Sequence, residues 1–153
     1  MRFAILGLLV SASAFATEYE PRKFKYTQFS DRMGNQSYYD CEDVRRNVIS
    51  SLKALGATDL NVNCYGGLNT FGGYHTPNSI SAKFSVPVSL TAETARKTTV
   101  NFRPQDAFYP ACDLNVGILE EMLPLFPNVT VVTANNFCFD GRTRWNYSLE
   151  VLR

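Results

Sequence analysis

The four cysteines of this 153-residue chain fall into two similarly placed pairs. Cys41 opens a run with helical apolar spacing, and Cys64 lies in the alternating run that follows it. Cys112 and Cys138 occupy the corresponding places later in the chain, and the members of the two pairs are 23 and 26 residues apart. The pattern predicts one α-β-β unit used twice, each copy joined by a disulfide from helix start to strand.

Residues 1–16 have the pattern of a cleaved secretory signal peptide. Arg2 supplies the positive start, residues 3–10 form a short apolar run, and Ala14-Phe15-Ala16 matches the usual cleavage site. The apolar run is too short to span a membrane. A buried N-terminal strand or helix is the other interpretation. We expect a bacterial protein whose mature part, residues 17–153, is periplasmic or secreted.

Export bears directly on the cysteines, because an oxidising compartment favours disulfides. Four cysteines allow three pairings, and the duplicated pattern favours Cys41–Cys64 with Cys112–Cys138. Each closed loop is expected to stabilise its unit by about 3 kcal/mol in the chain-entropy model. Free thiols, one of them a nucleophile, are the alternative, and a link between Cys41 and Cys112 would contradict the duplicated unit.

The charge balance excludes some partners. The chain has 15 Lys and Arg against 14 Asp and Glu, and loss of Arg2 with the signal peptide leaves equal numbers. A neutral chain lacks the basic excess of a nucleic-acid binder or of a polybasic membrane binder. Its length suits one domain with its own core.

Two helices are indicated by apolar spacing. The first has Asp40 as N-cap and Gly56 just beyond its end, with one apolar face formed by Val44, Val48, Leu52 and Leu55. The second covers 113–122 and is stopped by Pro124, with Val116, Leu119 and Leu123 on its apolar face. A shift of 71 residues places Cys41 on Cys112 and Val48 on Leu119.

Alternating residues predict the strands, which cover 58–64, 82–90, 98–103, 129–139 and 143–151. The segment 22–29 is either an edge strand, protected by Lys23 and Lys25, or a flexible arm. Pro87 lacks a backbone N–H, which predicts an edge position or a bulge for its strand. Cys138 has the opposite parity to Val129, so we expect a bulge at Asn135-Asn136.

The predicted order is β-α-β-β-β-α-β-β, which indicates an α+β fold. We expect a mainly antiparallel sheet with both helices packed on one face, a disulfide-stapled sandwich of ferredoxin-like kind. Residues 17–153 then form a single domain with an internal duplication at about 37–103 and 104–153.

The search for catalytic motifs finds little. His75 is the one histidine, and no nucleophile elbow, zinc-protease helix, phosphate loop or dinucleotide fingerprint is present. No His, Cys and carboxylate cluster has metal-ligand spacing, so we expect no metal and no cofactor. The acidic group Asp40, Glu42 and Asp43 is interpreted as favourable charge at a helix N-terminus rather than a catalytic pair.

The best candidate for a binding site is the segment 66–77, which is rich in glycine and carries Phe71, Tyr74 and His75. Long loops in compact domains are often functional, and aromatic and polar groups together suit recognition. The alternative is a hairpin connection whose aromatic side chains fold onto the sheet. The tip around Arg142, Arg144 and Trp145 is a second binding candidate, because an exposed pair of arginine and aromatic residue can bind glycans or protein. The alternative is that Trp145 points inward, as alternation indicates, and that Arg142 only solvates the turn.

These observations favour a small exported protein that binds rather than catalyses. Its expected partner is an envelope or extracellular protein, or a cell-wall glycan. One alternative is an exported hydrolase that uses carboxylates brought together by the fold, with Asp106, Asp113 and Asp140 as candidates. The other is an inhibitor of a secreted enzyme, which would present the same 66–77 loop.

Overall fold

The structure is a computed structural model that describes residues 17–27, 39–67, 76–90, 95–102, 111–139 and 142–153, without the side chains of 111, 136–139 and 142–145. Its elements in chain order are β1 (Tyr19–Thr27), α1 (Cys41–Ala54), β2 (Thr58–Gly67), β3 (Thr76–Pro87), β4 (Lys97–Phe102), α2 (Ala111–Met122), a 3-10 turn (Leu123–Leu125), β5 (Val129–Phe139) and β6 (Arg142–Leu152). The predicted signal peptide, residues 1–16, lies outside the described residues. No helix in the described ranges is long and apolar enough to cross a bilayer.

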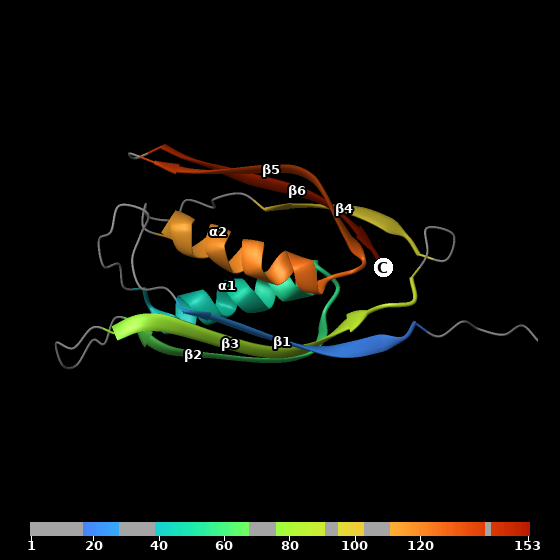
Figure 1. Ribbon diagram of the computed structural model, residues 1–153, viewed down its shortest axis with the longest axis horizontal. Helices are drawn as coiled ribbons and strands as arrows, with labels where there is room; N and C mark the ends of the chain where they lie inside the picture. The colour runs from blue at the N-terminus through green and yellow to red at the C-terminus, as the bar shows by residue number, and fades with distance from the viewer. Residues whose placement is uncertain (1–16, 28–38, 68–75, 91–94, 103–110, 140–141) are drawn as a thin grey trace, which may run out of the picture.

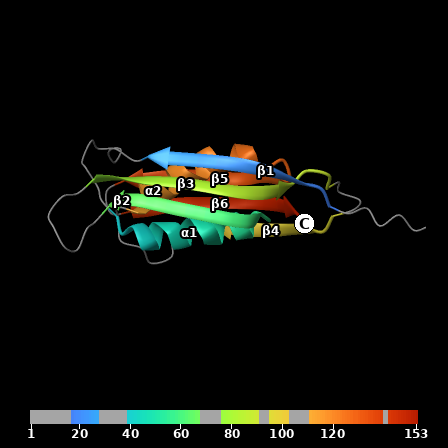
Figure 2. The same cartoon turned by 90° about the horizontal axis from the view of Figure 1, so that it is seen from below.

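The strands form two antiparallel three-stranded sheets, ordered β1-β3-β2 and β4-β6-β5. Both helices lie between the sheets, so the molecule has a sheet, a helical layer and a second sheet (Figure 1, Figure 2). The mixed α+β class and the antiparallel pairing are confirmed. The prediction of a single sheet with both helices on one face is wrong.

The physical reason lies in α2, which is apolar on opposite sides. Cys112, Val116 and Leu119 form one buried face, which includes two of the three residues that the helical spacing predicts. The third, Leu123, is half-buried in the 3-10 turn that follows the helix. Leu114 and Ile118 are also buried, and they point the opposite way around the helix. A helix that is apolar on both sides must be covered on both sides, which a single sheet cannot do.

The two sheets have the same internal order. In each, the strand that precedes the helix and the first strand after it are the edges, and the last strand is central. Strand β4, which falls within the predicted unit 37–103, pairs with β6 in the second sheet. The sheets therefore divide between Pro87 and Lys97.

The core joins the halves. Its fully enclosed side chains come from both helices, both central strands and their connections, and include Leu52, Leu55, Ile80, Leu114, Met122 and Leu149. The rings of Phe84 in β3 and Phe126 after α2 stack with centroids 5.5 Å apart. One continuous core thus links residues from both predicted units.

The position of Pro87 differs from its prediction. Strand β3 is central rather than an edge, and Pro87 is tolerated because it is the last residue of the strand. Strand β1 is an edge, as one of the two interpretations predicted, with Phe24 buried and Lys23 and Lys25 exposed.

The expected bulge in β5 is present, but not at Asn135-Asn136. The ladder with β6 is unbroken through those residues, and the register shifts between Val131 and Thr133 instead. Paired positions of an antiparallel ladder share a face. The shift therefore places position 138 on the same face as Val129. The bulge at Asn135-Asn136 was predicted to have this same effect.

Candidate functional site

Several strands and helices begin or end at the same end of the molecule, next to the segments that connect them. This end carries the last residues of β1, β2 and β5, the first residues of β3 and β6, and the first residues of both helices (Figure 1). The connections 28–38, 68–75 and 140–141 leave from this end, which we call the loop end. It is the natural place to look for a site, because binding residues concentrate on loops held by a rigid scaffold.

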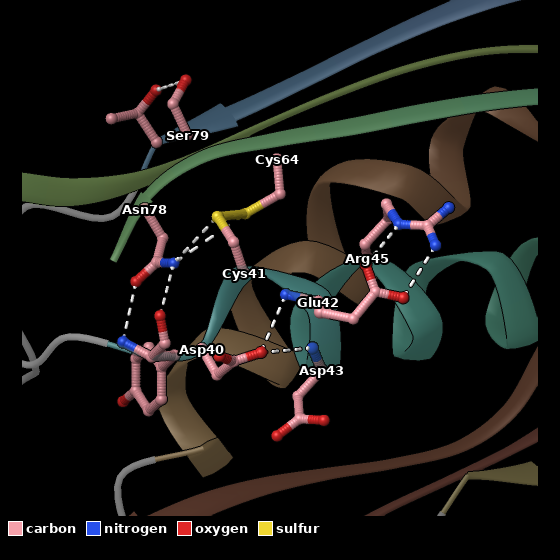
Figure 3. Close-up of a disulfide and its surroundings, with 10 residues drawn as sticks. Asp40, Cys41, Glu42, Asp43, Arg45, Cys64, Asn78 and Ser79 are labelled. Atoms are coloured by element: carbon pink, nitrogen blue, oxygen red, sulfur yellow. Dashed lines mark hydrogen bonds and ion pairs between the residues drawn. A yellow bond between two sulfur atoms is a disulfide. The ribbon is translucent and has the colours of Figure 1, made fainter. Parts of the chain in front are cut away.

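A disulfide braces the loop end. Cys41 is the first residue of α1 and Cys64 lies in β2, and their Sγ atoms are joined at 2.00 Å (Figure 3). This confirms the first predicted pair. Cys112 is also disulfide-bonded. The side chain of Cys138 lies outside the described residues, so the pairing Cys112–Cys138 stays a prediction.

Asn78 is a second brace, and it is fully buried. Its Oδ1 accepts from the backbone N–H of Tyr39 at 2.9 Å, and its Nδ2 donates to the carbonyl of Tyr39 at 3.0 Å. The same Nδ2 lies 3.6 Å from the Sγ of Cys41 and 3.8 Å from that of Cys64 (Figure 3). One side chain thus fixes the chain that enters α1 beside the disulfide.

Sequence reasoning missed Asn78, although a signal was available. Asn78 shares parity with Ile80 and Ala82, both of which point into the core. A polar residue on the inward face of a strand needs partners, because burying an amide without hydrogen bonds costs free energy. Asn78 finds those partners in the backbone of Tyr39.

Two glycines complete the base of the 68–75 connection. Gly66 and Gly67 have φ of 82° and 81°, in the left-handed region that glycine adopts freely. A Cβ on Gly67 would lie 2.1 Å from the carbonyl oxygen of Tyr39, and one on Gly66 would lie 2.3 Å from that of Pro77. The predicted 66–77 loop is therefore shorter, since the ladder extends to Gly67 and Thr76.

The predicted binding residues are not tested by the structure. Phe71, Tyr74 and His75 lie outside the described residues. Arg142 begins β6 at the loop end, but its side chain and that of Trp145 are not described. The described residues that flank both sets, Gly67, Thr76 and the start of β6, lie at the loop end. The roles of the candidates stay predictions.

The acidic group at the start of α1 has local partners. The side chain of Asp40 accepts from the backbone N–H groups of Glu42 at 2.9 Å and Asp43 at 3.0 Å, which confirms it as N-cap (Figure 3). Glu42 accepts two hydrogen bonds from Arg45, and this pairing lowers the pKa of the Glu42 carboxyl. Asp43 pairs with Arg46. These contacts support the charge-at-helix-end interpretation.

Of the three carboxylates proposed for a hydrolase, the structure describes one. Asp106 and Asp140 lie outside the described residues, and Asp113 is half-buried in the first turn of α2. Across the described ranges, no group of three His, Cys, Asp or Glu side chains is placed to hold a metal ion. The hydrolase alternative therefore stays a prediction, because only one of its three carboxylates is described.

A separate polar cluster lies where β1 meets α2. A Cβ on Gly117 would lie 2.3 Å from the hydroxyl of Tyr26, so the missing side chain lets Tyr26 pack against the helix. Burial, with further contributions from Asp113, Glu121 and Glu120, raises the pKa of the Tyr26 phenol above its ordinary 10.0. Both causes disfavour the phenolate.

This shift predicts an alkaline loss of stability. Below pH 10 the phenol is neutral in both states, whereas above it the unfolded chain releases a proton that folded Tyr26 retains. The free energy of unfolding should therefore fall as the pH rises from 10 toward the folded pKa, and Tyr26→Phe should flatten that fall. Urea unfolding across this pH range measures it.

The matched control is Tyr65→Phe, because Tyr65 is 65% exposed in β2. It should leave the pH dependence of the parent unchanged. Equal flattening by both substitutions would show that the alkaline loss does not come from the environment of Tyr26.

No family model, curated protein or solved structure matches this chain.

Proposed function

We propose that this protein is a small exported binding module that contacts its partner through the loop end. The observation that carries the proposal is the bracing beneath the 68–75 connection. Three features lie where that connection leaves the scaffold. They are the Cys41–Cys64 disulfide, the buried amide of Asn78 and the close approach of Gly67 to the backbone of Tyr39.

Restraint of the residues that flank the 68–75 connection favours binding, because it lowers the cost of ordering the loop. Ordering a loop on association costs free energy, and a scaffold that restrains the ends of the loop reduces the part of that cost that arises at its base. Phe71, Tyr74 and His75 would then supply contact area and hydrogen-bonding groups. Arg142 would add a cation from the neighbouring hairpin at the same end.

The disulfide also supports the proposed compartment. Structural disulfides persist in oxidising environments and are rare in the cytosol. Export through residues 1–16 would bring the chain to such an environment, in the periplasm or outside the cell. The expected partner is accordingly an envelope or extracellular protein, or a cell-wall glycan.

We further propose that the chain arose from a repeated β-α-β-β unit. The two sheets share one strand order, and each unit would contribute one strand before its helix and two after it. The boundary would fall in 88–96. This unit is one strand longer than the α-β-β pattern that the cysteines alone suggest.

Affinity capture tests the binding proposal. The oxidised exported protein would be immobilised and exposed to purified cell wall and, separately, to envelope extract. A variant with Phe71, Tyr74 and His75 changed to Ala should lose at least about tenfold in affinity for any retained partner, as expected when interface anchors are removed.

The control variant is Tyr19→Ala, because Tyr19 is an exposed aromatic residue at the opposite end of β1. It should bind like the parent. Retention that survives the triple substitution, or that Tyr19→Ala abolishes, would contradict the site. A tight complex with a secreted hydrolase would identify the partner of an inhibitor, and release of soluble sugars would indicate the hydrolase alternative.

A further inference from the structure

Strand β5 is the one edge among the described sheets without a charged side chain. Edge strands expose unpaired backbone groups, and soluble proteins commonly guard them with charges, proline, bulges or short length. In β1 these guards are Pro21, Arg22, Lys23 and Lys25. Strand β2 has register shifts near both ends, and β4 is only six residues long and begins at Lys97.

Strand β5 has none of these charges. Its eleven residues, VTVVTANNFCF, contain no charged side chain, no proline and no glycine. Like β2 it has a register shift, between Val131 and Thr133, and among the described strands it is paired with β6 alone. The strand is thus a long, neutral edge, and its Val, Thr and Phe residues are types that favour strands.

The exposed part of this edge is also apolar. Residues 130–135 are all exposed, with Val131 at 47% and Val132 at 54%. Val131 and its partner Leu149 in β6 lie on the same face of the sheet, but Leu149 is fully buried and Val131 is exposed. The packing that buries β6 on this face therefore does not bury β5 at this position. Figure 1 shows β5 at the outside of the molecule.

We propose that residues 130–134 of β5 pair in antiparallel fashion with the same residues of a second copy of this chain. Charge selects this occupant. Two copies of one edge bring the same set of charges together, so an edge that carries several charges of one sign repels its own copy. Strand β5 has no charge to oppose, whereas β1 would bring lysines and an arginine together.

The pairing has a defined structural result. Two three-stranded sheets would join into one of six strands, in the order β4-β6-β5-β5-β6-β4. The chain carries a formal net charge of only +1, so two copies repel each other weakly. Because the contact is a single strand edge, we expect a weak, concentration-dependent dimer rather than an obligate one.

Sedimentation velocity of the oxidised exported protein over a wide concentration range tests the proposal. The mean mass should rise from monomer toward dimer and stop there. Thr133→Lys, which places a charge at this edge, should lower the association constant by about tenfold. Thr99→Lys is the matched control, because Thr99 is an exposed threonine on β4, the other edge of the same sheet.

A second measurement does not depend on any variant folding. Amide hydrogen exchange of the parent should slow at residues 130–134 as concentration rises, with no change in β4. A protein that is monomeric up to about 1 mM, or a dimer equally sensitive to Thr99→Lys, would overturn the proposal. So would open-ended assembly, since antiparallel pairing about a two-fold axis closes at two copies.

Discussion

Changing Gly67 to alanine is expected to lower the free energy of unfolding by about 3 kcal/mol or more. The new Cβ would lie 2.1 Å from the carbonyl oxygen of Tyr39 and 2.6 Å from Nδ2 of Asn78. The backbone at Gly67 also has φ of 81°, which alanine adopts at a cost. Because the first obstacle is backbone, relief requires moving the chain that enters α1. Urea unfolding of the oxidised protein measures the loss.

Gly56→Ala is the matched control. Gly56 has φ of 89°, and the nearest atom to its added Cβ is Nδ2 of Asn128 at 3.5 Å, an ordinary contact. This variant should lose only about 1 kcal/mol, the conformational cost alone. Similar losses at Gly56 and Gly67 would show that the close approach to Tyr39 contributes nothing.

Removing the Cys41–Cys64 disulfide by a double change to alanine is expected to cost about 3 kcal/mol. The bond closes a loop whose ends are 23 residues apart, which restricts the unfolded chain. The substitution also takes both sulfur atoms away from the buried amide of Asn78. Unfolding of parent and variant under oxidising conditions gives the difference directly.

The control for this prediction is reduction of the parent. Since Cys112 is also disulfide-bonded, a reductant should destabilise the parent at least as much as the double substitution does. It should destabilise the double variant further. A variant as stable as the parent to within a few tenths of a kcal/mol would contradict the bracing role of this disulfide.

The sequence predicted local features well. The N-cap at Asp40, the buried face of α1 and the Cys41–Cys64 bond depend on residues close in the chain or on a repeated spacing, and the structure confirms them. The strand at 129–139 was predicted with the bounds that β5 has. Capping and alternation act over a few residues, so a single sequence reveals them.

The arrangement of the sheets could not be predicted in this way. Pro87 suggested an edge or a bulge for β3, but it is the last residue of a central strand. The sequence places Leu114 and Ile118 on a second apolar side of α2, but the prediction considered only the side with Val116 and Leu119. One overlooked helix face changes the number of layers.

The buried asparagines show a different limit, because their partners are far away in the chain. Nδ2 of Asn128 donates to the carbonyl of Leu55 at 3.2 Å and to that of Leu152 at 3.0 Å, joining the end of α1 to the end of β6. Asn78 similarly holds Tyr39 at the loop end. Spacing along the chain cannot reveal contacts of this kind, although inward parity can flag the residue that makes them.

Hydrogen–deuterium exchange on the protein with its captured partner tests the central claim, that the loop end is the binding surface. Exchange should slow in 68–75 and 140–141, with little change at the opposite end, in 55–58, 88–90 and 95–96. Protection confined to the opposite end, with 68–75 exchanging as in the free protein, would contradict it.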